Sequence, residues 1–254
     1  RSYFINPFPS KSSATNIFQG NPNIDPTYSN GIDIGYLKRY EKLTLNGSVY
    51  YRKSTGEFTF ISENTGDSVL VNDILVPVLR RTPINLASKQ IGVEFSANFS
   101  QSKKWRLRGS FNFYESETIG EYKGIVYDSK NLSWSGRLNN YLNLFSSIDW
   151  QTSFRYRAPQ KTAVSERKAS ISTNTAFSKD LLKDKITLTF KVNDIFETGK
   201  WRIESFNESY KSYSESNWRG GRSFELNLIY RFNQKKNQKK QEPSYEDYEG
   251  EGFG

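Results

Sequence analysis

The sequence contains no cysteine, no histidine and no methionine among its 254 residues. Without cysteine, the chain has no disulfide framework and no thiolate metal site. Without histidine, Ser-His-Asp and Cys-His catalytic arrangements and His-ligated metal sites are excluded as well. The sequence therefore predicts no catalytic residue, no metal site and no cofactor, and thus a protein that is not an enzyme. Because it begins at Arg1, we expect a mature product or a piece of a longer chain.

Long hydrophobic runs are also missing. The longest uninterrupted apolar stretch runs from Ile74 to Leu79 and contains Pro77, whereas a membrane-spanning helix needs about 20 apolar residues. Helical membrane proteins are therefore excluded. A membrane-spanning β-strand needs only about 9 to 11 residues, and only every second residue meets lipid.

The formal charge is +9, but its distribution does not indicate a nucleic-acid partner. Lys and Arg are scattered along the chain, and the one dense run, residues 235–240, is followed by an acidic segment, residues 242–251. No recognised nucleic-acid motif accompanies the charge. We expect no nucleic-acid binding.

Strict alternation of apolar and polar residues is the strongest pattern in the sequence. From Ile91 to Phe99 every second residue is apolar, and Glu94, Ser96 and Asn98 lie between them. A period of two predicts β-strands with one apolar face. Counting the weaker examples, we expect nine strands, which contain residues 32–36, 43–51, 91–99, 105–113, 132–138, 148–156, 169–177, 186–192 and 224–232.

The connections between these strands alternate in length. Short links cover residues 39–42, 101–104, 143–146 and 179–185, and long links cover residues 54–85, 115–130, 158–167 and 194–222. Soluble β-sandwiches also have alternating strands, but short periplasmic turns and long extracellular loops are typical of outer-membrane barrels. If the first strand runs from the outside toward the periplasm, the last of nine antiparallel strands also ends on the periplasmic side.

Aromatic residues lie near the predicted strand ends, where membrane barrels carry interfacial girdles. Cross-strand packing in a soluble sheet is the alternative explanation. The polar face carries charges that would be costly in a dry core but not beside a hydrated lumen. The lumen-facing candidates are Arg106, Arg108, Arg137, Asp149 and Arg155.

Two long links contain possible sites. Residues 63–67 do not match the ligand spacing of a calcium loop, and we interpret them as a turn. The link at residues 194–222 contains an aromatic and basic cluster that could stack on a sugar or grip a protein, although an extracellular hairpin extending the last two strands is the simpler interpretation. The recognition candidates are Trp201, Tyr210, Tyr213 and Trp218.

Several short motifs follow one another along the chain. Ile5-Asn6-Pro7-Phe8 is followed by Gly20-Asn21-Pro22-Asn23-Ile24-Asp25-Pro26, and later by Tyr51-Arg52-Lys53, Val192-Asn193-Asp194-Ile195-Phe196 and Tyr230-Arg231-Phe232. This series resembles stretches of TonB-dependent receptor-like outer-membrane proteins. Pro22 and Pro26 cannot donate to a strand ladder, so they hold the chain in a loop before the first strand.

The resemblance implies an all-β transmembrane antiparallel β-barrel, of which this chain is the carboxy-terminal segment, about nine strands of about 22, with an amino-terminal plug outside it. Residues 1–26 are then the end of a preceding strand and an extracellular loop, and residues 27–232 hold the strands. Residues 233–254 depart from the family pattern and form a polar periplasmic tail, which we expect to be disordered unless a partner holds it.

Two functions follow as expectations. One is TonB-dependent uptake of a ligand through a plugged barrel, with outer-membrane lipid, the plug and an energy-coupling protein as partners. The other is a barrel that does not transport and serves as a structural subunit, with a lipoprotein or other outer-membrane subunits as partners. A soluble all-β carbohydrate-binding module is a third, weaker alternative.

Overall fold

The computed structural model describes residues 2–145, 148–206, 211–217 and 220–232. Within this part, the regular structure is almost all β-strand. The one helix in it, α1 (Ser2–Ile5), has four residues, and no described helix is long and apolar enough to cross a membrane. The predicted tail, residues 233–254, lies outside the described residues.

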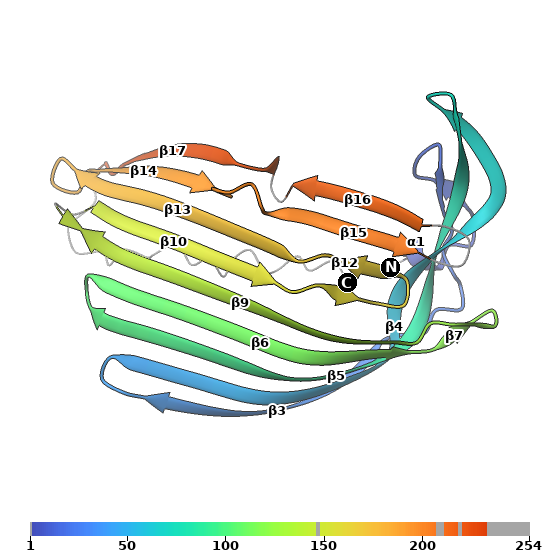
Figure 1. The fold of residues 1–254 in the computed structure, drawn as a ribbon, viewed down its shortest axis with the longest axis horizontal. Coiled ribbons are helices and arrows are strands. Elements are labelled where there is room, and N and C mark those ends of the chain that lie inside the picture. Colours follow the sequence, from blue (N-terminus) through green and yellow to red (C-terminus); the bar gives the residue numbers. More distant parts are fainter. Residues whose placement is uncertain (1, 146–147, 207–210, 218–219, 233–254) are drawn as a thin grey trace.

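Nine long strands pair antiparallel in chain order to form one curved sheet (Figure 1). They lie where the alternation predicts them. Within the described residues β3 pairs only with β4 and β17 only with β14, so the sheet is open. The strands are β3 (Tyr28–Arg39), β4 (Leu43–Val71), β5 (Ile74–Ser102), β6 (Trp105–Ile119), β9 (Ser129–Leu144), β10 (Ile148–Arg157), β13 (Ser170–Leu181), β14 (Ile186–Asn193) and β17 (Ser223–Tyr230).

The register joins the predicted apolar positions into one face. Phe95 lies opposite Gly47 on β4 and Phe111 on β6, and Leu138 on β9 lies opposite Phe154 on β10. Since side chains alternate between the two faces of a strand, residues that pair directly share a face. The same face continues to the last strand through Trp150 opposite Phe177, Phe177 opposite Phe190, and Phe190 opposite Leu226.

This apolar face is exposed. Val93, Phe95 and Phe111 keep 43%, 48% and 41% of their surface accessible, and no second sheet among the described residues packs on them. In a soluble sandwich these three side chains would fill a closed core, so the structure contradicts the sandwich alternative. The interpretation of the face as a lipid-contacting surface agrees with the exposure.

The longest predicted link, residues 54–85, is not a loop, so this prediction is wrong. Its residues belong to β4 and β5, which each run for 29 residues and remain paired to the end. The hairpin turns at Asn72 and Asp73, whose φ angles of 49° and 62° suit these residue types in a tight turn. The turn predicted at residues 63–67 is therefore also wrong. That segment is a bulge between Asn64 and Ser68, in which Gly66 adopts a φ of 88°.

The other long links form small sheets beyond the main one. β11 (Gln160–Lys161), β12 (Ser165–Arg167), β15 (Lys200–Phe206) and β16 (Lys211–Asn217) form a four-stranded sheet, which we call the loop sheet. β7 (Glu121–Tyr122) and β8 (Ile125–Val126) form a hairpin. Ile61, Ile84, Leu86 and Tyr127 form a buried cluster at this end of the molecule, and parts of the other links pack on it.

The first 26 residues dock on the extended hairpin. They contain α1, β1 (Ser10–Lys11) and β2 (Asn16–Phe18), and β2 pairs parallel with β5. A Cβ at Gly20 would lie 2.6 Å from the carbonyl oxygen of Phe4, so the glycine allows the chain to fold back on itself. Asn85 then accepts a hydrogen bond from the backbone N–H of Asp25 at 2.7 Å. These contacts give the Gly-Asn-Pro segment its structural role.

Candidate functional site

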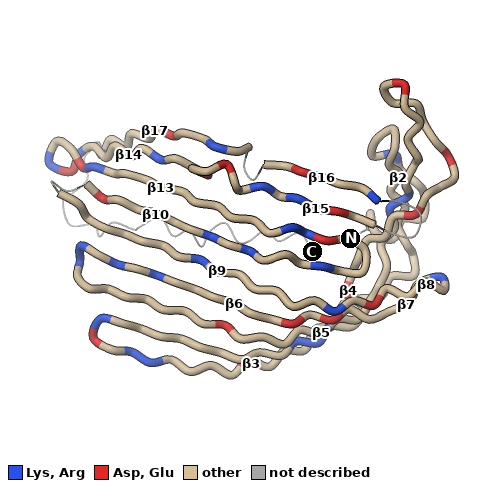
Figure 2. Tube along the Cα trace, in the orientation of Figure 1, with Lys and Arg blue, Asp and Glu red and all other residues tan. Residues whose placement is uncertain are grey.

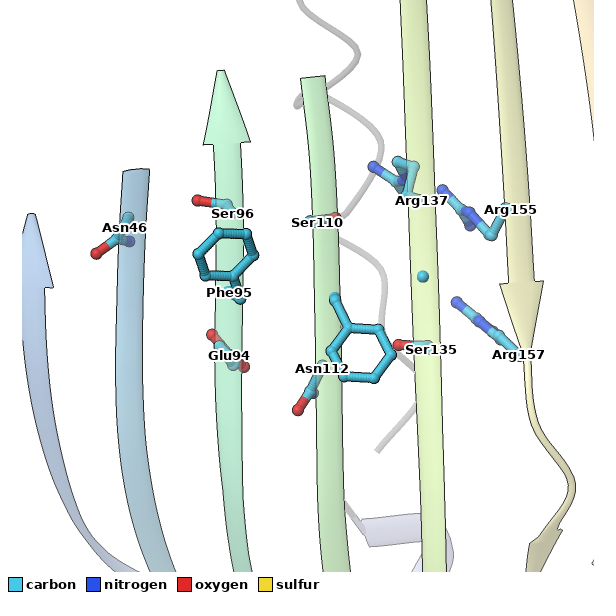
Figure 3. A pocket seen from close by; sticks show the side chains of 12 residues that line it. Asn46, Glu94, Phe95, Ser96, Ser110, Asn112, Ser135, Arg137, Arg155 and Arg157 are labelled. Carbon is cyan, nitrogen blue, oxygen red and sulfur yellow. The ribbon is translucent and has the colours of Figure 1, made fainter. Parts of the chain in front are cut away.

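A trough of about 390 Å³ lies on the polar face of the sheet. The pairing places Arg155 directly opposite Arg137 and places Arg157 opposite Ser135. Figure 3 shows the three arginine side chains over β9 and β10, with Glu94 on β5 farther along the sheet. The residues around the trough are Asn46, Glu94, Ser96, Ser110, Asn112, Ser135, Arg137, Arg155 and Arg157, together with Gly136 and with Phe95 and Phe111, whose side chains belong to the opposite, apolar face.

The charge of this trough is unbalanced. It has three arginines and one acid, Glu94, and β6 and β9 separate the Glu94 strand from the Arg157 strand. Among the described residues, the guanidinium groups of Arg155 and Arg157 have neither a hydrogen bond nor an ion pair. Like charges directly opposite each other destabilise a strand pair. Arg155 and Arg157 therefore present donors and positive charge without a counter-ion among the described residues.

A smaller hollow adjoins the trough and shares Arg155 and Arg157 with it. Its other walls include Lys200 and Trp201 from β15. The guanidinium of Arg167 lies 4.8 Å from the centre of the Trp201 ring. Burial, and next the like charge of Arg157, lower the pKa of Arg167. Positive groups thus continue from the main sheet to the loop sheet.

A second polar group lies nearer the short turns. Asp149 accepts hydrogen bonds from the hydroxyl of Tyr141 at 2.8 Å and from the amide of Asn143 at 2.7 Å. The guanidinium of Arg106 lies 4.3 Å from the centre of the Tyr141 ring. The carboxylate of Asp149 is thus satisfied within the wall and is not open to a ligand.

The structure thus divides the lumen-facing candidates into separate groups. Arg137 and Arg155 line the trough, and Arg106 and Asp149 are joined through Tyr141. Arg108 lies opposite Asn98 and Asn139 and does not line the trough.

The recognition candidates separate as well. Trp201 adjoins the trough, whereas Tyr213 is 58% exposed on β16, with its hydroxyl donating to Glu215 at 2.6 Å. Tyr210 and Trp218 lie outside the described residues. The alternative interpretation of this link as a hairpin is correct for β15 and β16. The hairpin continues beyond β14 and β17 in the strand direction (Figure 1), but β15 pairs with β12, so the two strands belong to the loop sheet and not to the main sheet.

Sequence reasoning missed Arg157 and Tyr141. Arg157 continues the alternation of β10 by one more step after Arg155, so extending the pattern to the end of the strand would have found it. Tyr141 lies on the same face of β9 as the polar residues Arg137 and Asn139. The alternation of apolar and polar residues does not identify it, because tyrosine is aromatic and can occupy either face.

The Val-Asn-Asp-Ile-Phe motif forms a turn that connects the main sheet to the loop sheet. Asp194 is 5% exposed, and its carboxylate accepts the backbone N–H groups of Thr198 and Gly199 at 3.1 and 3.0 Å. Asn174 accepts the N–H of Asp194 at 2.8 Å. The motif thus fixes the start of β15, and with it the position of Trp201 beside the trough.

A family model described as the outer membrane protein beta-barrel family matches residues 1–230. Searches of curated proteins and of solved structures found no match. The match supports the outer-membrane barrel in the predicted resemblance and does not extend to TonB-dependent receptors. This chain belongs to the outer membrane protein β-barrel family.

Proposed function

We propose that this chain forms part of the wall of a bacterial outer-membrane barrel that takes up a ligand by TonB-dependent transport. One observation carries the proposal. The same sheet has an exposed apolar face that suits lipid and a polar face that bears an arginine-lined trough. A wall that only separated lipid from protein would not need arginines such as Arg155 and Arg157, which have no counter-ion among the described residues, on its inner side.

The proposed orientation places the extended hairpin and the loop sheet outside the cell and the short turns in the periplasm. Long outer loops and short periplasmic turns are the usual arrangement of such barrels. Strand length supports it, since the 29 residues of β4 far exceed the 9 to 11 that a bilayer requires. Figure 2 shows Lys and Arg at the short turns, where Lys42, Lys103, Lys104 and Lys185 lie.

Closure requires more strands than the described sheet contains. Because nine strands pair antiparallel in succession, β3 and β17 run in the same direction. An antiparallel barrel therefore needs an odd number of further strands between these two edges. A barrel of about 22 strands with a plug meets this condition. Trp201 and Tyr213, on the loop sheet, are the proposed extracellular recognition residues.

The experiment compares solute depletion from a defined medium by cells with and without the intact protein. Each strain is also measured after its energy-coupling protein has been inactivated, and the medium is followed by mass spectrometry. We expect at least one solute whose depletion requires both proteins. Unchanged depletion, together with loss of a multi-subunit outer-membrane complex in the deletion strain, would replace the proposal with the structural-subunit function.

A further inference from the structure

The arginine-lined trough has the composition of a ligand site. Guanidinium groups match carboxylate and phosphate oxygens in pairs of hydrogen bonds. Arg155 and Arg157 have no hydrogen-bond or ion-pair partner in the part of the chain that the structure describes, and both are half-buried, so their orientations are restricted. Together with Arg137, they line the trough (Figure 3).

The rest of the lining indicates what the anionic group is attached to. Ser96, Ser110 and Ser135 carry hydroxyls, and Asn46 and Asn112 carry amides. Such side chains donate to and accept from hydroxyl groups. The volume of about 390 Å³ falls within the range of small-molecule sites, about 300 to 1,000 Å³. An acid, Glu94, lies at the far side of the trough and can accept a hydrogen bond from a hydroxyl group.

Trp201 lies at the border of the trough. It lines the hollow that shares Arg155 and Arg157 with the trough. The hollow has a volume of only about 30 Å³, and Arg167 lies 4.8 Å from the centre of the Trp201 ring, so Trp201 borders the arginines without offering a surface for a ring to stack on. The trough itself therefore supplies the anion donors and the hydroxyl partners.

We propose that the trough binds an anionic, hydroxyl-bearing small solute of the sugar phosphate or sugar acid class, with Arg137, Arg155 and Arg157 holding its anionic group. This proposal names a ligand class for the proposed function, and it rests on that function because the solute must reach the polar face of the sheet. Binding and uptake are measured in separate experiments, so that a failure of the binding proposal can be told from a failure of the uptake proposal.

The experiment is titration calorimetry on the intact protein in detergent with glucose 6-phosphate and glucuronate, and with glucose as the uncharged comparison. At least one of the two anions is expected to bind, and glucose is expected to bind at least tenfold more weakly or not at all. Arg155→Gln, and separately Arg157→Gln, should weaken binding by about tenfold or more, because each removes a charged donor. Arg155→Lys should be intermediate, since it keeps the charge but loses the paired donors.

Arg108→Gln is the matched control. It removes the same charge from the same face but outside the trough, so affinity should stay within about twofold, given that separated charges in water are screened. An equal loss in Arg108→Gln and Arg155→Gln would overturn the proposal in favour of a diffuse positive surface. Absence of binding by both anions, or equal binding of glucose, would overturn it as well.

A form of the protein lacking residues 242–251 distinguishes a free solute from the acidic segment of the same chain. Unchanged affinity in this form supports a site for a free solute. Binding by the shortened form alone would identify the chain's own carboxylates as the occupant and would overturn the proposal. Retained folding of each variant is checked by its mobility on gels before and after heating.

Discussion

The ring of Tyr50 lies across the backbone of Gly92, its direct cross-strand partner on β5. A Cβ at Gly92 would fall 2.6 Å from both the Cζ and the hydroxyl oxygen of Tyr50. The tyrosine is only 2% exposed although it lies on the polar face, and its hydroxyl donates to Asn112 at 3.1 Å. The glycine thus makes room for an aromatic side chain that fixes β4, β5 and β6 together.

Gly92→Ala should destabilise the sheet, because the added methyl group must displace the Tyr50 ring or the neighbouring carbonyl of Phe113. We expect the free energy of unfolding to fall by about 1 to 3 kcal/mol, as for other overpacked sites, measured by urea titration of the refolded protein. Gly109→Ala is the control, since its nearest contact would be Leu138 at 3.7 Å. Equal effects of the two substitutions would contradict the packing role of Gly92.

Asp194→Ala should loosen the turn that starts β15. It leaves the backbone N–H groups of Thr198 and Gly199 without their acceptor, and a lost buried acceptor costs about 1 to 3 kcal/mol. Asp194→Asn should cost less, because it keeps one acceptor oxygen and tolerates the φ of 48° at this position.

Limited proteolysis between β14 and β15 measures this effect. Cleavage should be faster in Asp194→Ala than in Asp194→Asn, and slowest in the unsubstituted protein. If all three were cleaved at the same rate, the carboxylate would have no part in fixing the turn.

Acid should weaken the loop sheet through Glu204 and Glu215. Hydrogen bonds from Lys168 to Glu204, and from Lys200 and then Tyr213 to Glu215, lower the pKa of each carboxyl below its ordinary value of 4.5. A group whose folded pKa is depressed stabilises the fold above its unfolded pKa and loses this contribution as pH falls through the folded pKa. The contribution is therefore fully present above the ordinary value of 4.5 and is lost as the pH falls through the lower folded pKa of each carboxyl.

Hydrogen-exchange protection factors for β15 and β16, which correct for the intrinsic effect of pH on exchange, test this expectation. Protection should hold from pH 7 to about pH 5 and then fall. Glu204→Gln combined with Glu215→Gln should reduce the fall, because these side chains no longer titrate. An acid dependence that is the same in the double variant would assign the effect to other groups.

Alternation made the main sheet predictable, because lipid and a polar interior impose opposite requirements on successive residues. Phe95 and Phe111 were placed on one face by period alone, and the register puts them side by side. The loop sheet was only partly predictable. Its strands are short and pair across distant links, as Glu166 does with Glu204, and local sequence contains little information about such pairing.

The sequence predicted the face on which two of the trough's arginines lie, but not how they are arranged there. Arg137 and Arg155 were assigned to the polar face from their parity, but their direct opposition depends on the register between β9 and β10. The turn at residues 63–67 was misplaced because Asn64 and Gly66 carry turn chemistry, which here serves a bulge. The actual turn, at Asn72 and Asp73, uses residues that tolerate the same positive φ without a glycine.

The most direct test of the account is the depth-matched placement of arginine on the two faces of the sheet. Val93→Arg, Phe95→Arg and Phe111→Arg put the charge on the apolar face, and Ser96→Arg and Ser110→Arg put it one residue away on the polar face. Near the bilayer midplane the lipid-side charge costs about 2 to 4 kcal/mol. Folding into lipid vesicles, followed by gel mobility, should fail or be strongly reduced for the first three and proceed for the other two. Equal folding of both sets would contradict the claim that this sheet separates lipid from a polar interior.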